Sequence, residues 1–215
     1  TLRNCPGISG YNISAYIYNS NNNTISNVVA YNSSTTGIVI KNGINNTLIG
    51  STVYSNVDGI NVNGGRNNAL ISNIVRNQTQ NGFVIIGTSN NTLANNSAYL
   101  NSYAGFQIEI TSNNTFTNNT AYNNTQNGFT IEADSSSNIY RNNSAYYNSN
   151  GFWFQTQSNN NTFTGNRAFN NSQNGFRLST ASNNSFYNNT AYNNTDSGFH
   201  LLSGSNRAVF VNNTV

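Results

Sequence analysis

Large apolar residues recur along the chain at a nearly constant interval. If the first of each group is taken as an anchor, the anchors are Leu2, Ile25, Leu48, Leu70, Leu93, Phe116, Tyr140, Phe163, Phe186 and Val209, spaced 22 to 24 residues apart. Later in each interval a glycine precedes two apolar residues spaced two apart, as in Phe106/Ile108 and Phe129/Ile131. Residues two apart lie on one face of a β-strand. Each interval therefore predicts three short strands separated by polar corners.

A unit of this size cannot bury its own apolar face, whereas stacked copies shield one another. We therefore predict an all-β fold, a right-handed, three-sided parallel β-helix (solenoid) of about nine coils with 22–24 residues each. Strands of adjacent coils would lie ~4.8 Å apart, giving a rod roughly 45 Å long. Because the repeat covers residues 1–215 without a linker, we expect one solenoid domain, either whole or part of a longer solenoid.

Asparagine dominates the predicted corners, with 52 residues in the chain. Stacked asparagines can bond their side-chain amides from coil to coil as a ladder. Two columns fit that role, one two residues before the anchor and one three residues after it. The first is Asn23, Asn46, Asn68, Asn91, Asn114, Asn138, Asn161 and Asn184, and the second is Asn73, Asn96, Asn119, Asn143, Asn166, Asn189 and Asn212. Cys5 begins the second column, which predicts a small buried hydrophobe rather than a nucleophile.

The corners also carry the N-glycosylation acceptor pattern Asn-x-Ser/Thr. Its 17 asparagines are Asn12, Asn22, Asn32, Asn45, Asn77, Asn90, Asn95, Asn113, Asn118, Asn123, Asn142, Asn160, Asn170, Asn183, Asn188, Asn193 and Asn212. Composition alone predicts about 12, so their phasing into three corner columns is more informative than their number. We expect outward asparagines that carry sugar. The alternative is that Asn-Asn-Thr simply makes a favourable corner.

Composition excludes several classes of function. Only 13 residues are charged, and the net charge of +3 is scattered, so nucleic acid is not an expected partner. A single Cys, a single His and the absence of Met disfavour copper ligation and a disulfide framework. Few carboxylates disfavour calcium, so we expect no metal and no cofactor. No apolar run is long enough to span a membrane. The missing initial Met predicts a processed or trimmed chain from which any signal peptide is already gone. We expect a secreted or cell-surface protein.

The repeat resembles a known group. The pattern N-x-F-x-N-N-x-A-Y-x-N-x(4)-G-F-x-L, seen in "NNTFTNNTAYNNTQNGFTIEA" from position 113, is similar to right-handed parallel β-helix repeats of the pectate-lyase-like superfamily, closest to NosD-like or CASH-type repeats. Such repeats occur in archaeal and bacterial surface proteins. The resemblance implies the fold but does not select a function, because the superfamily includes polysaccharide lyases, carbohydrate binders and surface proteins.

The third strand of each coil carries no acceptor sequence and is the expected contact face. Candidate interface or sugar-binding residues there are Val84, Ile86, Glu109, Glu132, Trp153, Arg177 and Leu202. Several are apolar on a face expected to meet solvent, which is typical of an interface. Glu109 and Glu132 share a column in adjacent coils, as a pair of catalytic carboxylates would. The plainer interpretation, which we favour, is two solvated carboxylates, because no long loop builds a cleft.

Three functions remain open. The first is a structural extracellular protein, an N-glycosylated subunit of a surface layer, sheath or filament that assembles with itself. The second is a carbohydrate-binding adhesin module that uses the face around Trp153. The third is a polysaccharide lyase or hydrolase, although we assign no catalytic residue.

Overall fold

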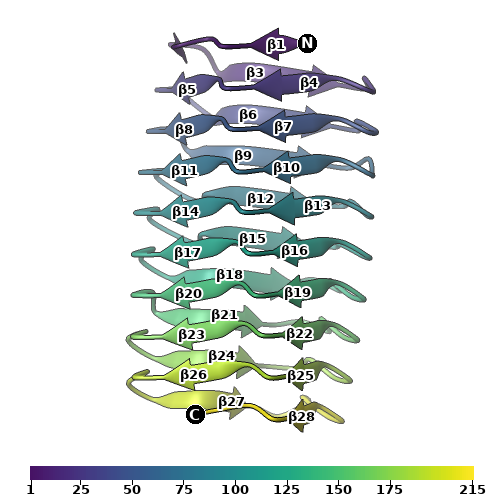
Figure 1. Ribbon diagram of the computed structural model, residues 1–215, viewed down its shortest axis with the longest axis vertical. Helices are drawn as coiled ribbons and strands as arrows, with labels where there is room; N and C mark the ends of the chain where they lie inside the picture. Colours follow the sequence, from purple (N-terminus) through teal and green to yellow (C-terminus); the bar gives the residue numbers. More distant parts are fainter.

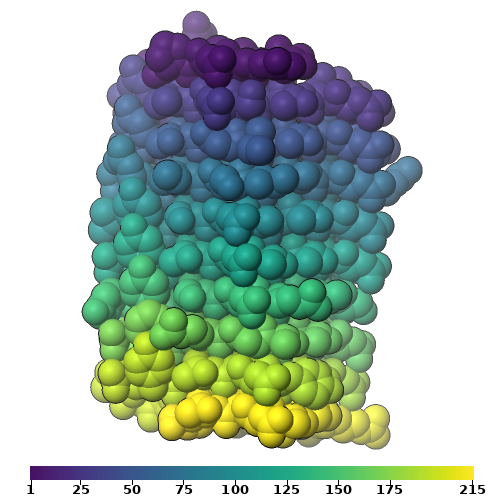
Figure 2. Space-filling view, viewed as in Figure 1, coloured from purple at the N-terminus to yellow at the C-terminus, as the bar shows by residue number.

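A computed structural model describes residues 1–215 and contains 28 short β-strands and no helix. Each coil contributes one strand to each of three sheets, and every strand pairs in parallel with its equivalents in the coils before and after it (Figure 1). The predicted solenoid is thus confirmed. Viewed as a solid, the molecule is an even stack of layers from one end of the chain to the other (Figure 2).

The first sheet contains the anchor residues. It has ten strands in the order of the chain: β1 (Leu2–Arg3), β4 (Thr24–Ser26), β7 (Thr47–Ile49), β10 (Ala69–Ile71), β13 (Thr92–Ala94), β16 (Thr115–Thr117), β19 (Ile139–Arg141), β22 (Thr162–Thr164), β25 (Ser185–Tyr187) and β28 (Val209–Val211). In most of these strands only the middle side chain is buried, because a three-residue strand turns one side chain inward and two outward.

The second sheet turns a small residue inward, most often alanine. Its nine strands are β2 (Ile8–Ser9), β5 (Val29–Tyr31), β8 (Thr52–Tyr54), β11 (Ile74–Arg76), β14 (Ser97–Tyr99), β17 (Thr120–Tyr122), β20 (Ser144–Tyr146), β23 (Arg167–Phe169) and β26 (Thr190–Tyr192). Outward tyrosines stack from coil to coil, with ring centroids 4.7 Å apart for Tyr99/Tyr122 and 5.1 Å for Tyr122/Tyr146. Where the column lacks an aromatic residue, the Arg76 guanidinium lies 4.6 Å from the Tyr54 ring centroid.

The third sheet has the longest strands and carries the candidate site. Its nine strands are β3 (Ile13–Tyr18), β6 (Thr36–Lys41), β9 (Asp58–Asn63), β12 (Phe83–Ile86), β15 (Phe106–Glu109), β18 (Asn127–Glu132), β21 (Asn150–Phe154), β24 (Asn174–Leu178) and β27 (Ser197–Leu201). The glycine before each inward Phe allows close packing: a Cβ at Gly128 would lie 2.7 Å from both the Ala145 Cβ and the Gly151 carbonyl oxygen.

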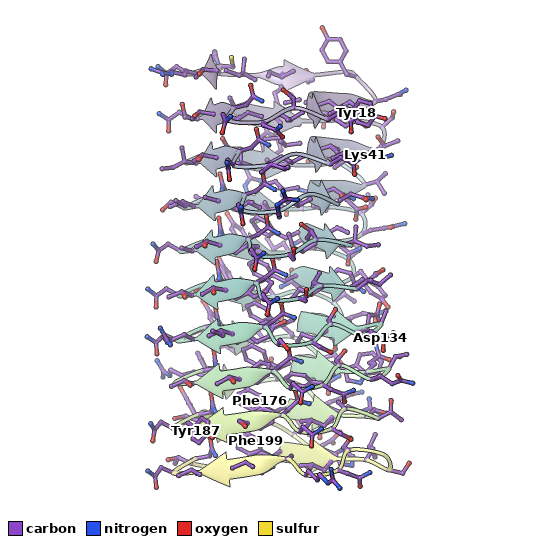
Figure 3. All side chains as sticks on the ribbon, turned by 90° about the vertical axis from the view of Figure 1, so that its right-hand side faces the viewer. Tyr18, Lys41, Asp134, Phe176, Tyr187 and Phe199 are labelled. Atoms are coloured by element: carbon purple, nitrogen blue, oxygen red, sulfur yellow. The ribbon has the colours of Figure 1, made fainter.

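From Phe83 onward the core contains stacks of aromatic rings along the solenoid axis, and in the first coils aliphatic residues fill the same positions. The third-sheet phenylalanines lie directly over one another, with centroids 4.6 Å apart for Phe106/Phe129 and 4.7 Å for Phe129/Phe152. Phe176 and Phe199 continue the stack at 4.8 Å (Figure 3). These near-parallel contacts add to the area that each ring buries.

Asparagine ladders line the corners, and there are three rather than the two that the sequence predicted. The third ladder runs through Ser33, Asn56, Gln78, Asn101, Asn124, Asn148, Asn171 and Asn194, each accepting a backbone N–H bond from the residue before it in this series. Each ladder side chain replaces backbone bonds that the corner cannot make. A buried side-chain acceptor, most often asparagine, therefore stabilises most corners.

Two details of the sequence prediction are wrong or incomplete. In the last coil Phe210, not Val209, pairs with Phe186, and Asn213, not Asn212, continues the second ladder. The preceding corner contains one more residue than the spacing suggested, which shifts the register by one. Cys5 is only half-buried, although it packs against the core cluster as a small apolar residue would.

Candidate functional site

The outer face of the third sheet presents two side-chain columns. The strand register aligns Gln107, Thr130, Trp153 and Arg177 in a central column, and it places Glu109 beside Glu132 in the next. The central column belongs to β15, β18, β21 and β24, so each coil contributes one residue to it. This alignment follows from the parallel pairing, because equivalent positions in successive coils stack without offset.

The central column is more buried than the sequence predicted. Val84 is 9% exposed, Gln107 5% and Thr130 1%, so Val84 does not form the exposed apolar patch expected of it. Neighbouring columns cover the centre: the Asn127 amide, for example, donates to Thr130 Oγ1 over 3.1 Å. Ile86 and Leu202 are half-buried. Periodicity distinguishes inward from outward positions, but it does not show that flanking side chains close over an outward one.

The two carboxylates share one amide. Gln107 Nε2 donates to Glu109 Oε1 over 2.9 Å and also to Glu132 Oε1. On the other side, Gln155 Nε2 donates to Glu132 Oε2 over 3.0 Å. Partial burial raises the pKa of Glu132, and the Glu109 charge raises it further, while the Gln107 hydrogen bond opposes both. The predicted pairing of Glu109 with Glu132 is present, but the sequence did not identify either glutamine as its partner.

Trp153 and Arg177 form the next part of the face. The Arg177 guanidinium carbon lies 5.1 Å from the Trp153 ring centroid, a cation–π contact between adjacent coils. Both side chains are half-buried. The His200 side chain follows Arg177 in the same column, also half-buried.

Unpaired polar atoms concentrate on this face. Of six buried side-chain nitrogen and oxygen atoms without a hydrogen-bond partner, four belong to the central column: Asn61 Oδ1, Gln107 Oε1, Trp153 Nε1 and Arg177 Nε. Buried polar groups are normally paired, and leaving one unpaired costs about 1–3 kcal/mol. Because all four atoms are buried, a bound molecule could pair with them only if the side chains around them turned outward.

The remaining acidic side chains lie apart from this face or serve the fold. Asp58 Oδ1 accepts from the Asn81 backbone N–H over 3.0 Å and from its side-chain amide over 3.2 Å. Asp134 and Asp196 are exposed. No three His, Cys, Asp or Glu side chains lie close enough to hold a metal ion, and no helix is long and apolar enough to cross a membrane.

Comparison with known proteins identifies the fold. A family model described as "Right handed beta helix region" matches residues 1–145 and 130–215. A search of curated proteins finds no match. Among solved structures, the periplasmic alginate epimerase AlgG is 18% identical with a TM-score of 0.75, covering 83% of this chain and 47% of its own.

Two further structures show the same architecture. Tailspike protein 2 of Escherichia coli O157:H7 bacteriophage CAB120 is 14% identical with a TM-score of 0.70, covering 95% of this chain and 35% of its own. Pectate lyase Pel9A is 21% identical with a TM-score of 0.61, and the match covers 84% of this chain and 55% of the lyase. The chain spans 47% of the length of the epimerase and 35% of the length of the tailspike. Identities this low establish the fold alone.

Proposed function

The chain belongs to the right-handed β-helix family, and from that premise we propose that it is a secreted protein whose third-sheet outer face binds a polysaccharide without cleaving it. The observation that carries this proposal is the half-buried Trp153 with the Arg177 guanidinium against its ring, next to a column of two half-buried glutamates. Sugar hydroxyls both donate and accept hydrogen bonds, so they can pair with the guanidinium and with the glutamate carboxylates.

The shape of the face suits a linear polymer. Each coil advances by one strand spacing, ~4.8 Å, so an extended chain along the axis meets one outward side chain in every coil. Trp153 supplies a broad apolar surface with a polar N–H, the combination that favours stacking against a sugar ring. The names of two structurally similar proteins, an alginate epimerase and a pectate lyase, refer to polysaccharides and agree with this ligand class.

We assign the carboxylate pair to binding rather than catalysis. Gln107 already bridges Glu109 and Glu132, and Gln155 holds the second Glu132 oxygen. A retaining glycosidase needs one free carboxylate as nucleophile and a second as acid, with the sugar between them. Here an amide occupies that position.

The binding test uses the single tryptophan of the chain. Trp153 fluorescence is followed during titration with alginate, polygalacturonate and a neutral glucan, and dissociation constants are taken from calorimetry. We expect at least one polymer to bind and Trp153→Ala to weaken binding about tenfold or more. Tyr187→Ala, which removes a half-buried aromatic residue from β25 on another sheet, should leave binding unchanged. Equal binding by the Trp153→Ala and Tyr187→Ala variants would refute the assignment.

The absence of cleavage is tested separately. Each polymer is incubated with the wild-type protein, and the solution is assayed for new reducing ends and for unsaturated sugar products. We expect neither. A product formed by the wild type and lost in Glu132→Gln would show that the carboxylate pair is catalytic and would overturn our assignment.

A second candidate is a structural role as a glycosylated subunit of a surface layer, sheath or filament. The observation that favours it is the uniformity of the coils: the three parallel sheets and one apolar core continue from coil to coil, as a rigid rod requires. Electron microscopy of native material tests this candidate. An ordered lattice or filament containing the protein supports it, and a dispersed monomer opposes it.

A further inference from the structure

The acceptor asparagines have a common geometry. Sixteen of the 17, all except Asn12, have φ between +52° and +58°. All except the half-buried Asn170 are exposed. Asparagine tolerates this left-handed backbone better than most residues, and its use at the turning point of each corner directs its side chain away from the core.

The amide nitrogens of these asparagines are free. None of the sixteen side chains forms a hydrogen bond, whereas the adjacent ladder asparagines are fully engaged; Asn119, next to Asn118, donates to the Leu93 carbonyl over 2.8 Å. Exposed left-handed asparagines outside the acceptor pattern are of two kinds: Asn67 makes no side-chain hydrogen bond either, whereas two others bond to the preceding coil. Asn27 Nδ2 donates to Asn4 Oδ1 over 3.2 Å, and Asn42 Nδ2 donates to Asn19 Oδ1 over 3.0 Å.

We propose that the corner asparagines of the acceptor pattern carry N-linked glycans, and that within one column two successive coils are never glycosylated together. The co-substrate is a lipid-phosphate-linked oligosaccharide supplied by a host transferase. The amide nitrogen forms a bond to the anomeric carbon of the first sugar, the bond from that carbon to the phosphate oxygen breaks, the lipid phosphate leaves, and the amide gives up one proton to a base.

The exclusion follows from the spacing of the coils. Aromatic rings of equivalent residues already touch face to face at 4.6–5.1 Å. A sugar ring is thicker than an aromatic ring because its carbons are tetrahedral and carry hydroxyls. Two branched glycans on equivalent asparagines of adjacent coils would therefore compete for the same space beyond their first sugars, whereas asparagines two coils apart have twice the room.

One tryptic fragment contains a direct test of the rule. Residues 77–141 contain no internal Lys or Arg and include six acceptors: Asn77, Asn90, Asn95, Asn113, Asn118 and Asn123. Asn90 and Asn113 are neighbours in successive coils, because the Asn90 N–H donates to the carbonyl of Ser112, the residue before Asn113. Asn95 and Asn118 are neighbours in the same way, through the bond from the Asn95 N–H to the Thr117 carbonyl. Asn77 and Asn123 are separated by Leu100 and do not compete. The fragment should therefore carry at most four glycans.

Glycans on the corners would also frame the proposed binding face. The acceptor columns stand at the two edges of the third sheet and at the corner opposite it, and β15, β18, β21 and β24 contain no acceptor. Sugar on the edges would leave the central column open. This placement does not depend on whether that column binds polysaccharide, so either proposal can fail alone.

The experiment is mass spectrometry of the intact protein and of fragment 77–141, isolated from its natural source. We expect glycan mass on the corner asparagines and no fragment with more than four glycans. An intact mass equal to that of the bare chain overturns the modification. A fragment with five or six glycans, or with Asn90 and Asn113 modified together, overturns the exclusion.

A pair of variants tests the exclusion in a glycosylating host. Thr115→Ala destroys the acceptor at Asn113. Glycan occupancy of Asn90 should then rise to the combined occupancy of Asn90 and Asn113 in the wild type. Thr117→Ala changes the other outward threonine of the same strand, β16, without altering an acceptor. Glycan occupancy of Asn90 should not change in this control variant. Circular dichroism confirms that both variants fold. Unchanged Asn90 occupancy in Thr115→Ala contradicts competition between coils.

Discussion

A single ladder asparagine should be far more important for stability than its exposed neighbour. Asn119 is fully buried; its Oδ1 accepts from Asn96 N–H over 3.0 Å and from Asn96 Nδ2 over 2.9 Å. Its Nδ2 donates to the Leu93 carbonyl over 2.8 Å and to Asn143 Oδ1 over 3.1 Å. Asn118 is exposed and makes no side-chain hydrogen bond. The two residues differ in ladder bonding while sharing one corner.

The magnitude follows from the groups left unpaired. In Asn119→Ala, the Asn96 N–H loses its partner and the Leu93 carbonyl keeps only its bond within the sheet, whereas Asn96 Nδ2 keeps the Leu70 carbonyl at 2.9 Å. At about 1–3 kcal/mol for the buried unpaired N–H and about 1 kcal/mol for the second lost bond, the variant should lose roughly 2–4 kcal/mol of unfolding free energy. Asn118→Ala loses only the tolerance of asparagine for a left-handed backbone, about 1 kcal/mol.

The assay is urea unfolding of protein that carries no glycan. Because long repeat arrays do not always unfold in one step, circular dichroism and Trp153 fluorescence are followed together. Trp153 lies on β21, in the coil after that of Asn119, so it reports the local loss. The reasoning is refuted if Asn119→Ala and Asn118→Ala shift the midpoint equally.

Two further predictions concern packing and charge. Gly128→Ala should destabilise the protein by about 1–3 kcal/mol in the same urea assay, because its Cβ would meet Ala145 and the Gly151 backbone at 2.7 Å, whereas Gly87→Ala enters open space and should cost only its backbone strain. The raised pKa of Glu132 means that the folded protein holds this proton more tightly than the unfolded chain. Thermal stability should therefore fall as pH rises from the ordinary glutamate value through the raised one, and Glu132→Gln should remove that slope; an unaltered slope in the variant would contradict the assignment.

Periodicity alone determined most of the fold. The 23-residue recurrence aligns Phe106 with Phe129 and Glu109 with Glu132, because in a parallel solenoid equal phase means direct contact. The third ladder escaped prediction because Gln78 and Ser33 interrupt its asparagines; the corner requires an inward acceptor, which several side chains can supply. The register of the last coil was ambiguous, since Val209 and Phe210 are both large and apolar and a corner can absorb one residue.

The candidate site was predictable in its membership but not in its chemistry. Alternation along β15 and β18 showed that Gln107 and Thr130 face outward. It did not show that they are buried, or that Gln107 turns its amide onto both carboxylates, because these depend on side-chain torsions and on the columns at either side. The unpaired atoms of Trp153 and Arg177 likewise appear only when every neighbour is in place.

The corner geometry also changes how the acceptor pattern should be interpreted. A left-handed Asn turns the chain, the next Asn points inward as a ladder residue, and the following outward strand position favours Thr, so the solenoid alone generates Asn-Asn-Thr. The number of acceptors is therefore not evidence for glycosylation. The state of the amide is a separate requirement: Asn27 and Asn42, which lie outside the pattern, bond to the coil before them, whereas the acceptors and Asn67 do not. The sixteen acceptor amides are free to form a bond outside the protein, which is the state that a transferase requires, and only the glycan mass decides whether they form it.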